Sequence, residues 1–202
     1  MISRPLRLGF LASGNGSSAE AIVTAIEAGR LAAEPRLLVS NRKSAPAFAW
    51  AEARGVPVRA IPTVGDPDAA DAALADAMAE AGVELIVMSG YLRRLGPKTL
   101  GRYAGRIINI HPGSLPQFGG EGMYGARVHQ AVIAAGVPES AIVIHAVDEE
   151  YDHGPELARL SVPLQPGDTA ESLEERVKAL EPAFFVETLA RVAAGQLELP
   201  GV

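Results

Sequence analysis

The sequence contains no cysteine, few aromatic residues and no apolar run long enough to cross a membrane. The absence of cysteine excludes disulfides, thiol nucleophiles and zinc sites built on thiolates, so histidine and carboxylate chemistry remains. The N-terminal stretch MISRPLRLGFLASG has an apolar run too short for a secretory signal, and it continues into a glycine-rich loop. We therefore expect a cytoplasmic protein.

An excess of positive charge is also lacking, because the formal net charge is −6 and the pI is about 5.3. A field of this sign repels nucleic acid and anionic membranes, so we expect neither as a partner, and an anionic ligand has to be held by a local device. With 202 residues, 48% of them hydrophobic, the chain is long enough for one sizeable core. No linker divides it, and we expect a single domain over 1–202.

Apolar, strand-like runs alternate with helical patterns along the first part of the chain. The expected strands are residues 7–12, 36–40, 57–61, 84–88 and 106–111. The expected helices are residues 18–31, 45–54, 68–82 and 125–135. Repeated β-α-β spacing predicts parallel strands joined by right-handed crossovers.

The C-terminal part has a different pattern. Runs at 141–147 and 157–163 can pair in antiparallel fashion, and an amphipathic helix is expected over about 170–194, after an Asp168-Thr169 cap. The expected fold class is α/β, a Rossmann-like open and mostly parallel sheet with helices on both faces and an antiparallel C-terminal strand.

The stretch SGNGSS, residues 13–18, joins the first expected strand to the first expected helix. Its glycines allow a tight turn, and the free N–H groups of a helix start suit a phosphate. The stretch matches neither G-x-G-x-x-G nor a P-loop, and a plain turn in which Ser17 or Ser18 caps the helix explains it equally well. The pattern alone leaves both interpretations open.

Asn109 and His111 end the fifth expected strand, within IINIHPGSLPQFGG, residues 107–120. They are two residues apart, so in a strand both side chains leave the same face. Pro112 and the glycines after it end the strand and open a loop, which is where open α/β sheets keep their sites. An amide and an imidazole presented together can stabilise an oxyanion and move a proton.

The segment DEEYDHGP, residues 148–155, supplies a candidate carboxylate. We expect Asp148, Glu149 and Glu150 to be solvated loop residues. Asp152 differs, because it precedes a His-Gly-Pro turn that fixes the backbone and aims the side chain. Its carboxylate would orient the imidazole of His111.

The other histidines give weaker signals. For His145, which lies in an alternating strand, we favour a core residue bonded to the backbone. For His129 a partly buried helix residue and a site residue are equally open. No local pair of ligands indicates zinc, and no metal is expected.

Four motifs follow one another in the chain: SGNGSS at 13–18, SGYLRRLGP at 89–97, NIHPGSLPQFGG at 109–120 and DHGP at 152–155. In these motifs, and over nearly its whole length, the chain resembles the phosphoribosylglycinamide formyltransferases, folate-dependent enzymes of purine synthesis. The resemblance implies small-molecule substrates: the formyl group of 10-formyltetrahydrofolate would pass to the amine of glycinamide ribonucleotide.

The resemblance also implies roles for individual residues. The catalytic trio would be Asn109, His111 and Asp152. The substrate's phosphate and ribose would be bound by Asn15, Gly16, Ser17, Ser18 and Glu181. The folate would be bound by Tyr91, Leu92, Arg93, Arg94 and Leu95, with backbone groups on the pterin and Arg93 facing the acidic tail. The phosphate half would cover about 1–100, and the folate and catalytic half about 85–202.

The chain departs from the family pattern at several positions. Arg94 stands where an aliphatic residue is common, Ser18 where Asn is common, and Gln117 where Lys is common. The segment 62–69 lacks an arginine that many members offer to the folate glutamate. The glycine-rich loop 119–129 is expected to become ordered when ligands bind.

Other functions remain open on the sequence. A formyltetrahydrofolate deformylase could use the same trio with water in place of the amine, whereas a noncatalytic folate- or nucleotide-binding module would need no trio. A sugar-nucleotide formyltransferase would need a larger acceptor pocket. We set aside a methionyl-tRNA formyltransferase, because it would need a basic RNA surface and this chain is acidic. The sequence does not separate a monomer from a homodimer.

Overall fold

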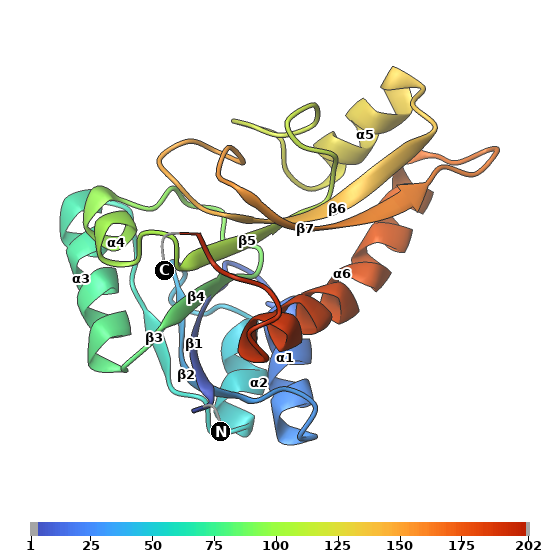
Figure 1. Cartoon of the computed structure of the whole chain (residues 1–202). Helices are drawn as coiled ribbons and strands as arrows, with labels where there is room; N and C mark the ends of the chain where they lie inside the picture. Colours follow the sequence, from blue (N-terminus) through green and yellow to red (C-terminus); the bar gives the residue numbers. More distant parts are fainter. Residues whose placement is uncertain (1–3, 201–202) are drawn as a thin grey trace.

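Seven strands form one sheet across the part of the chain that the structure, a computed structural model, describes, which is residues 4–200. The strands are β1 (Leu6–Leu11), β2 (Ala33–Ser40), β3 (Val58–Ala60), β4 (Leu85–Met88), β5 (Ile107–His111), β6 (Glu139–Ala146) and β7 (Glu156–Pro163). Their order in the sheet is β3-β2-β1-β4-β5-β6-β7 (Figure 1). The first five are parallel, and the pairs β5–β6 and β6–β7 are antiparallel.

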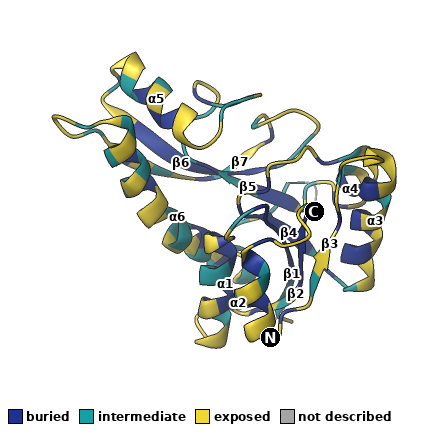
Figure 2. Ribbon diagram, turned by 180° about the vertical axis from the view of Figure 1, so that it is seen from behind, coloured by how far each residue is buried: buried dark blue, intermediate teal, exposed yellow. Residues whose placement is uncertain are grey.

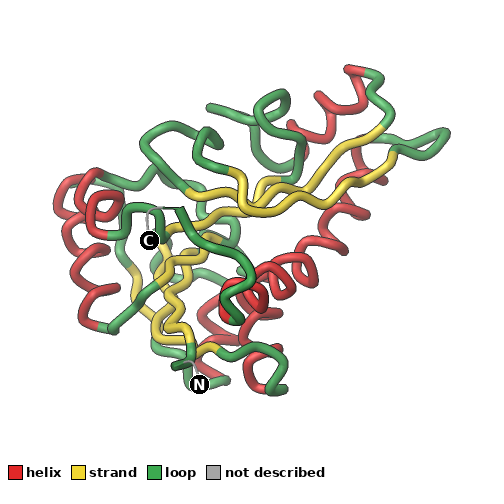
Figure 3. Tube along the Cα trace, in the orientation of Figure 1, coloured by secondary structure: helices red, strands yellow, loops and turns green. Residues whose placement is uncertain are grey.

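Helices cover both faces of this sheet. They are α1 (Ser17–Glu27), α2 (Ala47–Ala53), α3 (Pro67–Glu80), α4 (Pro97–Arg102), α5 (Ala126–Ala135) and α6 (Ala170–Ala193). Figure 3 shows the strands as one twisted layer with helices on either side. Because side chains alternate along a strand, Phe10 of β1 packs toward α1, α2 and α6, whereas Leu11 packs toward α3.

The antiparallel strands β6 and β7 extend beyond the parallel part as an arm (Figure 1). A separate apolar cluster fixes this arm, joining Val128 of α5, Ile142 of β6, Val162 of β7 and Leu173 of α6. Figure 2 shows the strands of the sheet as mostly buried and the outer surfaces of the helices as exposed. The cluster therefore fixes the strands β6 and β7 against α5 and α6.

The predicted fold class is confirmed, and the differences lie at element ends. The Thr169 cap is present as a capping box, in which the Thr169 side chain accepts from the Ser172 N–H. The expected helix 18–31 is too long, because Gly29 N–H donates to Ile26 O and Arg30 N–H to Ala25 O, and these bonds close the helix early.

One helix, α4, was not predicted. Its sequence PKTLGR is short and lacks an apolar repeat, so periodicity gives no signal. Its first turn is capped from another element: the Asp71 carboxylate on α3 accepts the N–H groups of Lys98 (2.8 Å) and Thr99 (3.1 Å). A cap supplied by a residue distant in sequence is invisible to a local pattern.

Candidate active site

The loops after β1 and β4 meet at the point where the strand order reverses, between these two neighbouring strands. The N–H of Ser13 donates to the Gly90 carbonyl (3.1 Å). The Ser13 hydroxyl donates to Oδ1 of Asn41 (2.6 Å) and accepts the N–H of Leu92 (2.9 Å). Ser13 therefore joins the loop that opens α1 to the loop that follows β4.

The glycine-rich loop has the backbone of an anion site. Gly16 has φ 63° and stands before the first residue of α1, which has no side-chain cap. A side chain at Gly16 would be strained at this φ and crowd Ala47 at 3.3 Å. Asn15 and Ser17 are exposed, whereas Ser18 is buried. The structure thus places Asn15 and Ser17 toward solvent and turns the Ser18 side chain inward.

Asn109 and His111 leave the same face of β5, as predicted. The Nδ1 atom of His111 lies 3.4 Å from Oδ2 of Asp152. The carboxylate of Asp152 comes from the loop between β6 and β7, which returns over the end of β5. The structure therefore brings together the three residues that the sequence singled out.

The backbone holds Asp152 in an uncommon conformation, with φ 55°. The Gly120 N–H donates to its Oδ2 (3.1 Å). Two residues later, Gly154 passes so close to the Ala146 carbonyl that no side chain fits there. Burial raises the pKa of the Asp152 carboxyl, but the bond to His145 and the nearness of His111 outweigh burial and hold this pKa below its usual range.

His145 is the site residue that the sequence did not assign to the site. The expected backbone bond exists, since Nδ1 of His145 lies 2.9 Å from the Ala146 carbonyl. The other ring nitrogen, Nε2, lies 3.3 Å from Oδ1 of Asp152 and 3.3 Å from Nδ2 of Asn109. His145 stands opposite Asn109 in the antiparallel β5–β6 register. The His145 ring therefore contacts two members of the trio, Asn109 and Asp152.

Both ring nitrogens of His111 have partners. Nε2 lies 2.7 Å from the Phe118 carbonyl, which requires an N–H at Nε2. Burial lowers the pKa of His111, and although the Asp152 carboxylate and the Phe118 carbonyl act in the opposite direction, the net pKa is below the usual value. With a hydrogen on Nε2, Nδ1 is the nitrogen that gains the second proton, and the protonated ring donates it to Asp152, which is why this carboxylate opposes the effect of burial on the pKa.

A cavity of about 440 Å³ lies between the loop after β4 and α3. Tyr91, Arg94 and Leu95 of the predicted folate segment line it, together with Glu149 from the loop before Asp152. Tyr91 and Leu95 are buried, while Leu92 and Arg93 are exposed. Three of the five predicted folate residues thus face one cavity.

Glu181 lies in α6 and is half-buried rather than fully exposed. Burial raises the pKa of its carboxyl to about 7, with Lys178 acting weakly in the opposite direction. Pro182, the next residue, lines a groove together with Ser17. This groove places the middle of α6 beside the start of α1.

Two further findings concern residues 4–200. Over this part of the chain, no helix is both long and apolar enough to cross a membrane. Within the same residues, no group of three or more His, Asp or Glu side chains is arranged to hold a metal ion. His129 is buried in α5 and lies outside the His111–Asp152 pair.

Comparisons with known proteins identify the family of the chain. The family model of formyl transferases matches residues 6–189. The chain is 33% identical over 198 residues to the chloroplastic phosphoribosylglycinamide formyltransferase of Arabidopsis thaliana, covering 96% of this chain and 68% of the relative. It is 36% identical over 181 residues to the phosphoribosylglycinamide formyltransferase of Bacillus subtilis (strain 168), covering 89% and 90%.

Solved structures share the fold. Glycinamide ribonucleotide transformylase 1 from Symbiobacterium toebii superposes with a TM-score of 0.88 at 31% identity, over 98% of this chain and 92% of that one. A formyltetrahydrofolate deformylase from Pseudomonas syringae pv. tomato superposes with a TM-score of 0.87, but at 20% identity and over 65% of its length. The second likeness concerns the fold alone.

Proposed function

This chain belongs to the formyl transferase family, and on that premise we propose that it transfers the formyl group of 10-formyltetrahydrofolate to the amine of glycinamide ribonucleotide. The reaction is a one-carbon transfer in purine biosynthesis. The observation that carries the proposal is the His111–Asp152 contact of 3.4 Å, with Asn109 two residues away on the same strand. A module that only binds its ligands has no need for an amide, an imidazole and a carboxylate at one point.

In the proposed reaction the acceptor amine forms a bond to the formyl carbon and gives a tetrahedral oxyanion. The bond from that carbon to N10 of the folate then breaks, the amine nitrogen loses a proton, and N10 gains one. Asn109 donates its amide N–H to the oxyanion, and His111 donates from Nε2. Asp152 orients His111 and assists the proton transfer to N10.

This role for His111 requires a change of hydrogen-bond partner. Its Nε2–H donates to the Phe118 carbonyl, which lies just before the glycine-rich loop 119–129. The formyl oxygen has to take the place of that carbonyl for the bond to stabilise the reacting group. We therefore link the expected ordering of loop 119–129 to the arrival of the substrates.

The substrates have separate proposed sites. The phosphate of the acceptor lies on the backbone N–H groups of residues 15–18, and Glu181 contacts its ribose. The folate lies along residues 91–95, with its ring in the cavity that Tyr91 and Leu95 line. Under this assignment residues up to about 100 hold the phosphate of the nucleotide, and residues from about 85 onward hold the folate, the trio and the ribose contact of Glu181.

The test is donor consumption with and without glycinamide ribonucleotide, with His111→Ala as the blank. We expect turnover only when the acceptor is present. Equal turnover without the acceptor would instead identify a deformylase, and no turnover in either mixture would contradict both enzyme assignments.

The cytoplasmic location stays a prediction, since one relative is named as chloroplastic. The oligomeric state, monomer or homodimer, also stays a prediction.

A further inference from the structure

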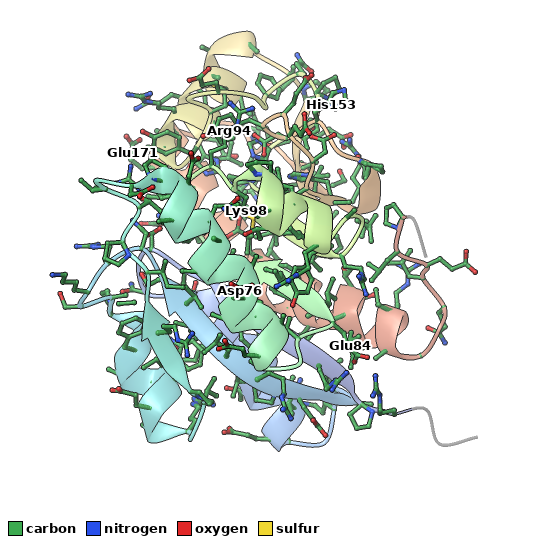
Figure 4. The ribbon with its side chains drawn as sticks, turned by 90° about the vertical axis from the view of Figure 1, so that its left-hand side faces the viewer. Asp76, Glu84, Arg94, Lys98, His153 and Glu171 are labelled. Carbon is green, nitrogen blue, oxygen red and sulfur yellow. The ribbon has the colours of Figure 1, made fainter. Side chains whose placement is uncertain are left out.

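Arg94 connects two loops that are distant in the sequence. Its Nη2 donates to the Glu149 carbonyl (2.6 Å), and its Cζ lies 5.9 Å from the centre of the Tyr151 ring. Arg94 belongs to the loop after β4, whereas Glu149 and Tyr151 belong to the loop between β6 and β7. Figure 4 shows Arg94 and His153 at the same end of the molecule, opposite the end that carries Glu84.

The Glu149–Tyr151 segment has few other attachments. Within residues 4–200, it makes one hydrogen bond outside its own loop, and that bond comes from Arg94. The Glu150 N–H donates to Asp148, which belongs to the same loop. Asp152 follows directly after this segment and has the positive φ noted above. Gly120 and His145 hold the Asp152 carboxylate directly, and the chain that leads to it is held by Arg94 through Glu149 and Tyr151.

The same guanidinium also borders the cavity. Arg94, Tyr91 and Leu95 line it from the loop after β4. Glu149 lines it from the loop between β6 and β7. A flat ligand that enters the cavity therefore touches the side chain that fixes the Asp152 loop. Arg94 therefore connects the cavity to the loop that presents Asp152 to His111.

We propose that Arg94 is a positioning residue, whose bond to the Glu149 carbonyl and contact with Tyr151 hold the loop that presents Asp152 to His111. The proposal rests on the function proposed above only for the catalytic role of Asp152. The mechanical part, that Arg94 fixes the 148–153 loop, does not depend on the substrate. Arginine suits the task because its planar group can donate to a carbonyl and lie over a ring at once.

The test compares Arg94→Ala, Arg94→Lys and the matched control Arg106→Ala. Arg106 also lies over a tyrosine ring, Tyr103, at 6.0 Å, but its guanidinium donates to the Arg102 carbonyl rather than to the 148–153 loop. Hydrogen–deuterium exchange of residues 148–153 reports on the loop without any substrate. Steady-state kinetics with 10-formyltetrahydrofolate and glycinamide ribonucleotide separate kcat from the two KM values.

We expect faster exchange of residues 148–153 in Arg94→Ala than in the wild type or in Arg106→Ala. We expect kcat to fall about tenfold, the size that one charge-assisted bond supports, with the KM for glycinamide ribonucleotide unchanged. Arg94→Lys should recover part of kcat, because the ammonium can donate to the Glu149 carbonyl but lacks the planar group.

The proposal is overturned if Arg94→Ala and Arg106→Ala show the same exchange in residues 148–153. A fall in melting temperature with unchanged kcat would equally overturn it, because that result describes a structural residue. If the wild type does not use glycinamide ribonucleotide, the proposed function fails, while the exchange comparison still decides whether Arg94 fixes the loop.

Discussion

Asp152 is the only non-glycine residue with a positive φ among residues 4–200, and its carboxylate also reaches two histidines. A left-handed backbone costs free energy for an L residue other than glycine, so the surrounding structure has to hold it. Contacts from Gly120 and the close passage of Gly154 do so here. Asp152 of the proposed trio thus combines a strained backbone with a carboxylate that contacts two histidines.

Asp152→Asn tests the link between the carboxylate and His111. Asparagine tolerates the same backbone conformation, so the variant should fold while it loses the charge. The carboxylate raises the pKa of His111 against the effect of burial, so its loss should lower this pKa further. If neutral His111 is the active form, the acid limb of kcat/KM lies below about pH 6.5 in the wild type and moves to lower pH in the variant.

We also expect kcat of Asp152→Asn to fall about a hundredfold or more. The control is Asp148→Asn, which removes a carboxylate of the same loop that pairs with His153 rather than with the trio. The control should keep the acid limb of the wild type. If the acid limb of kcat/KM is unchanged in Asp152→Asn, the carboxylate does not influence the pKa of His111.

Asn109→Ala removes the proposed oxyanion donor. One such donor contributes about 2.7–4 kcal/mol, so kcat should fall at least a hundredfold. Gln130→Ala, which removes an exposed amide on α5, serves as the control and should keep the wild-type kcat. Retention of more than about a third of the activity by Asn109→Ala would exclude Asn109 as a principal donor.

Glu181 should make stability depend on pH with a known sign. The pKa of this carboxyl is raised from 4.5 to about 7 in the folded chain. The contribution of the protonated carboxyl to folding stability is therefore fully present below the unfolded pKa and is lost as pH rises through about 7. Glu181→Gln should therefore match the wild type near pH 4.5 and melt at a higher temperature near pH 8.

Thermal melts of both proteins at the two pH values measure this difference. Glu187→Gln is the control, because Glu187 is an exposed carboxylate of the same helix. A gain in Glu181→Gln that is the same at both pH values would show that burial of the charged form is not its cause.

At the scale of elements, α4 depends on the carboxylate of Asp71, which caps it from α3. Asp71→Ala leaves the part-buried N–H of Lys98 and the buried N–H of Thr99 without this partner and should cost about 1–3 kcal/mol of unfolding free energy. Urea denaturation of Asp71→Ala and Asp76→Ala tests this. The Asp76–Arg102 pair is largely exposed, so Asp76→Ala should change stability by less than about 1 kcal/mol. Equal losses of unfolding free energy in Asp71→Ala and Asp76→Ala would show that the cap is not the cause.

The sequence predicted the elements whose signals are local. Apolar periodicity located the strands and the long helices, and the Asn109–His111 spacing gave the shared face of β5. The part played by His145 was not predictable, because it depends on the register that sets His145 opposite Asn109 in two strands separated by a loop and a helix. Likewise, the burial of Ser18 and the half-burial of Glu181 depend on how the folded helices pack, which no local sequence pattern gives.

At the scale of the whole molecule, loop 119–129 connects substrate arrival to the sheet. It starts beside Phe118, whose carbonyl accepts from His111, and its last residues form the first turn of α5, where Arg127 lies over the Tyr124 ring at 5.4 Å. We expect trypsin to cut after Arg127 more slowly when both substrates are present, because the loop orders around them. Equal cutting rates with and without substrates would contradict closure, while cleavage elsewhere in the chain provides the internal control.

The charge of the molecule fits a ligand held by backbone groups. The net charge is −6, and the proposed phosphate site depends on the N–H groups at the start of α1 rather than on a general positive field. The phosphate loop follows β1, and Asn109 and His111 end β5; these parallel strands lie on either side of β4, so the sheet places both sites at the same edge, beside the point where the strand order reverses. An acidic protein can thus bind a phosphorylated acceptor beside its catalytic residues.

The most direct measurement follows the formyl carbon itself. A single turnover with isotopically labelled 10-formyltetrahydrofolate and glycinamide ribonucleotide, stopped by rapid quenching, shows where the label goes. We predict label in formylglycinamide ribonucleotide for the wild type, and at least a hundredfold slower labelling for Asn109→Ala. Label in free formate, or equal labelling by both proteins, would contradict the account.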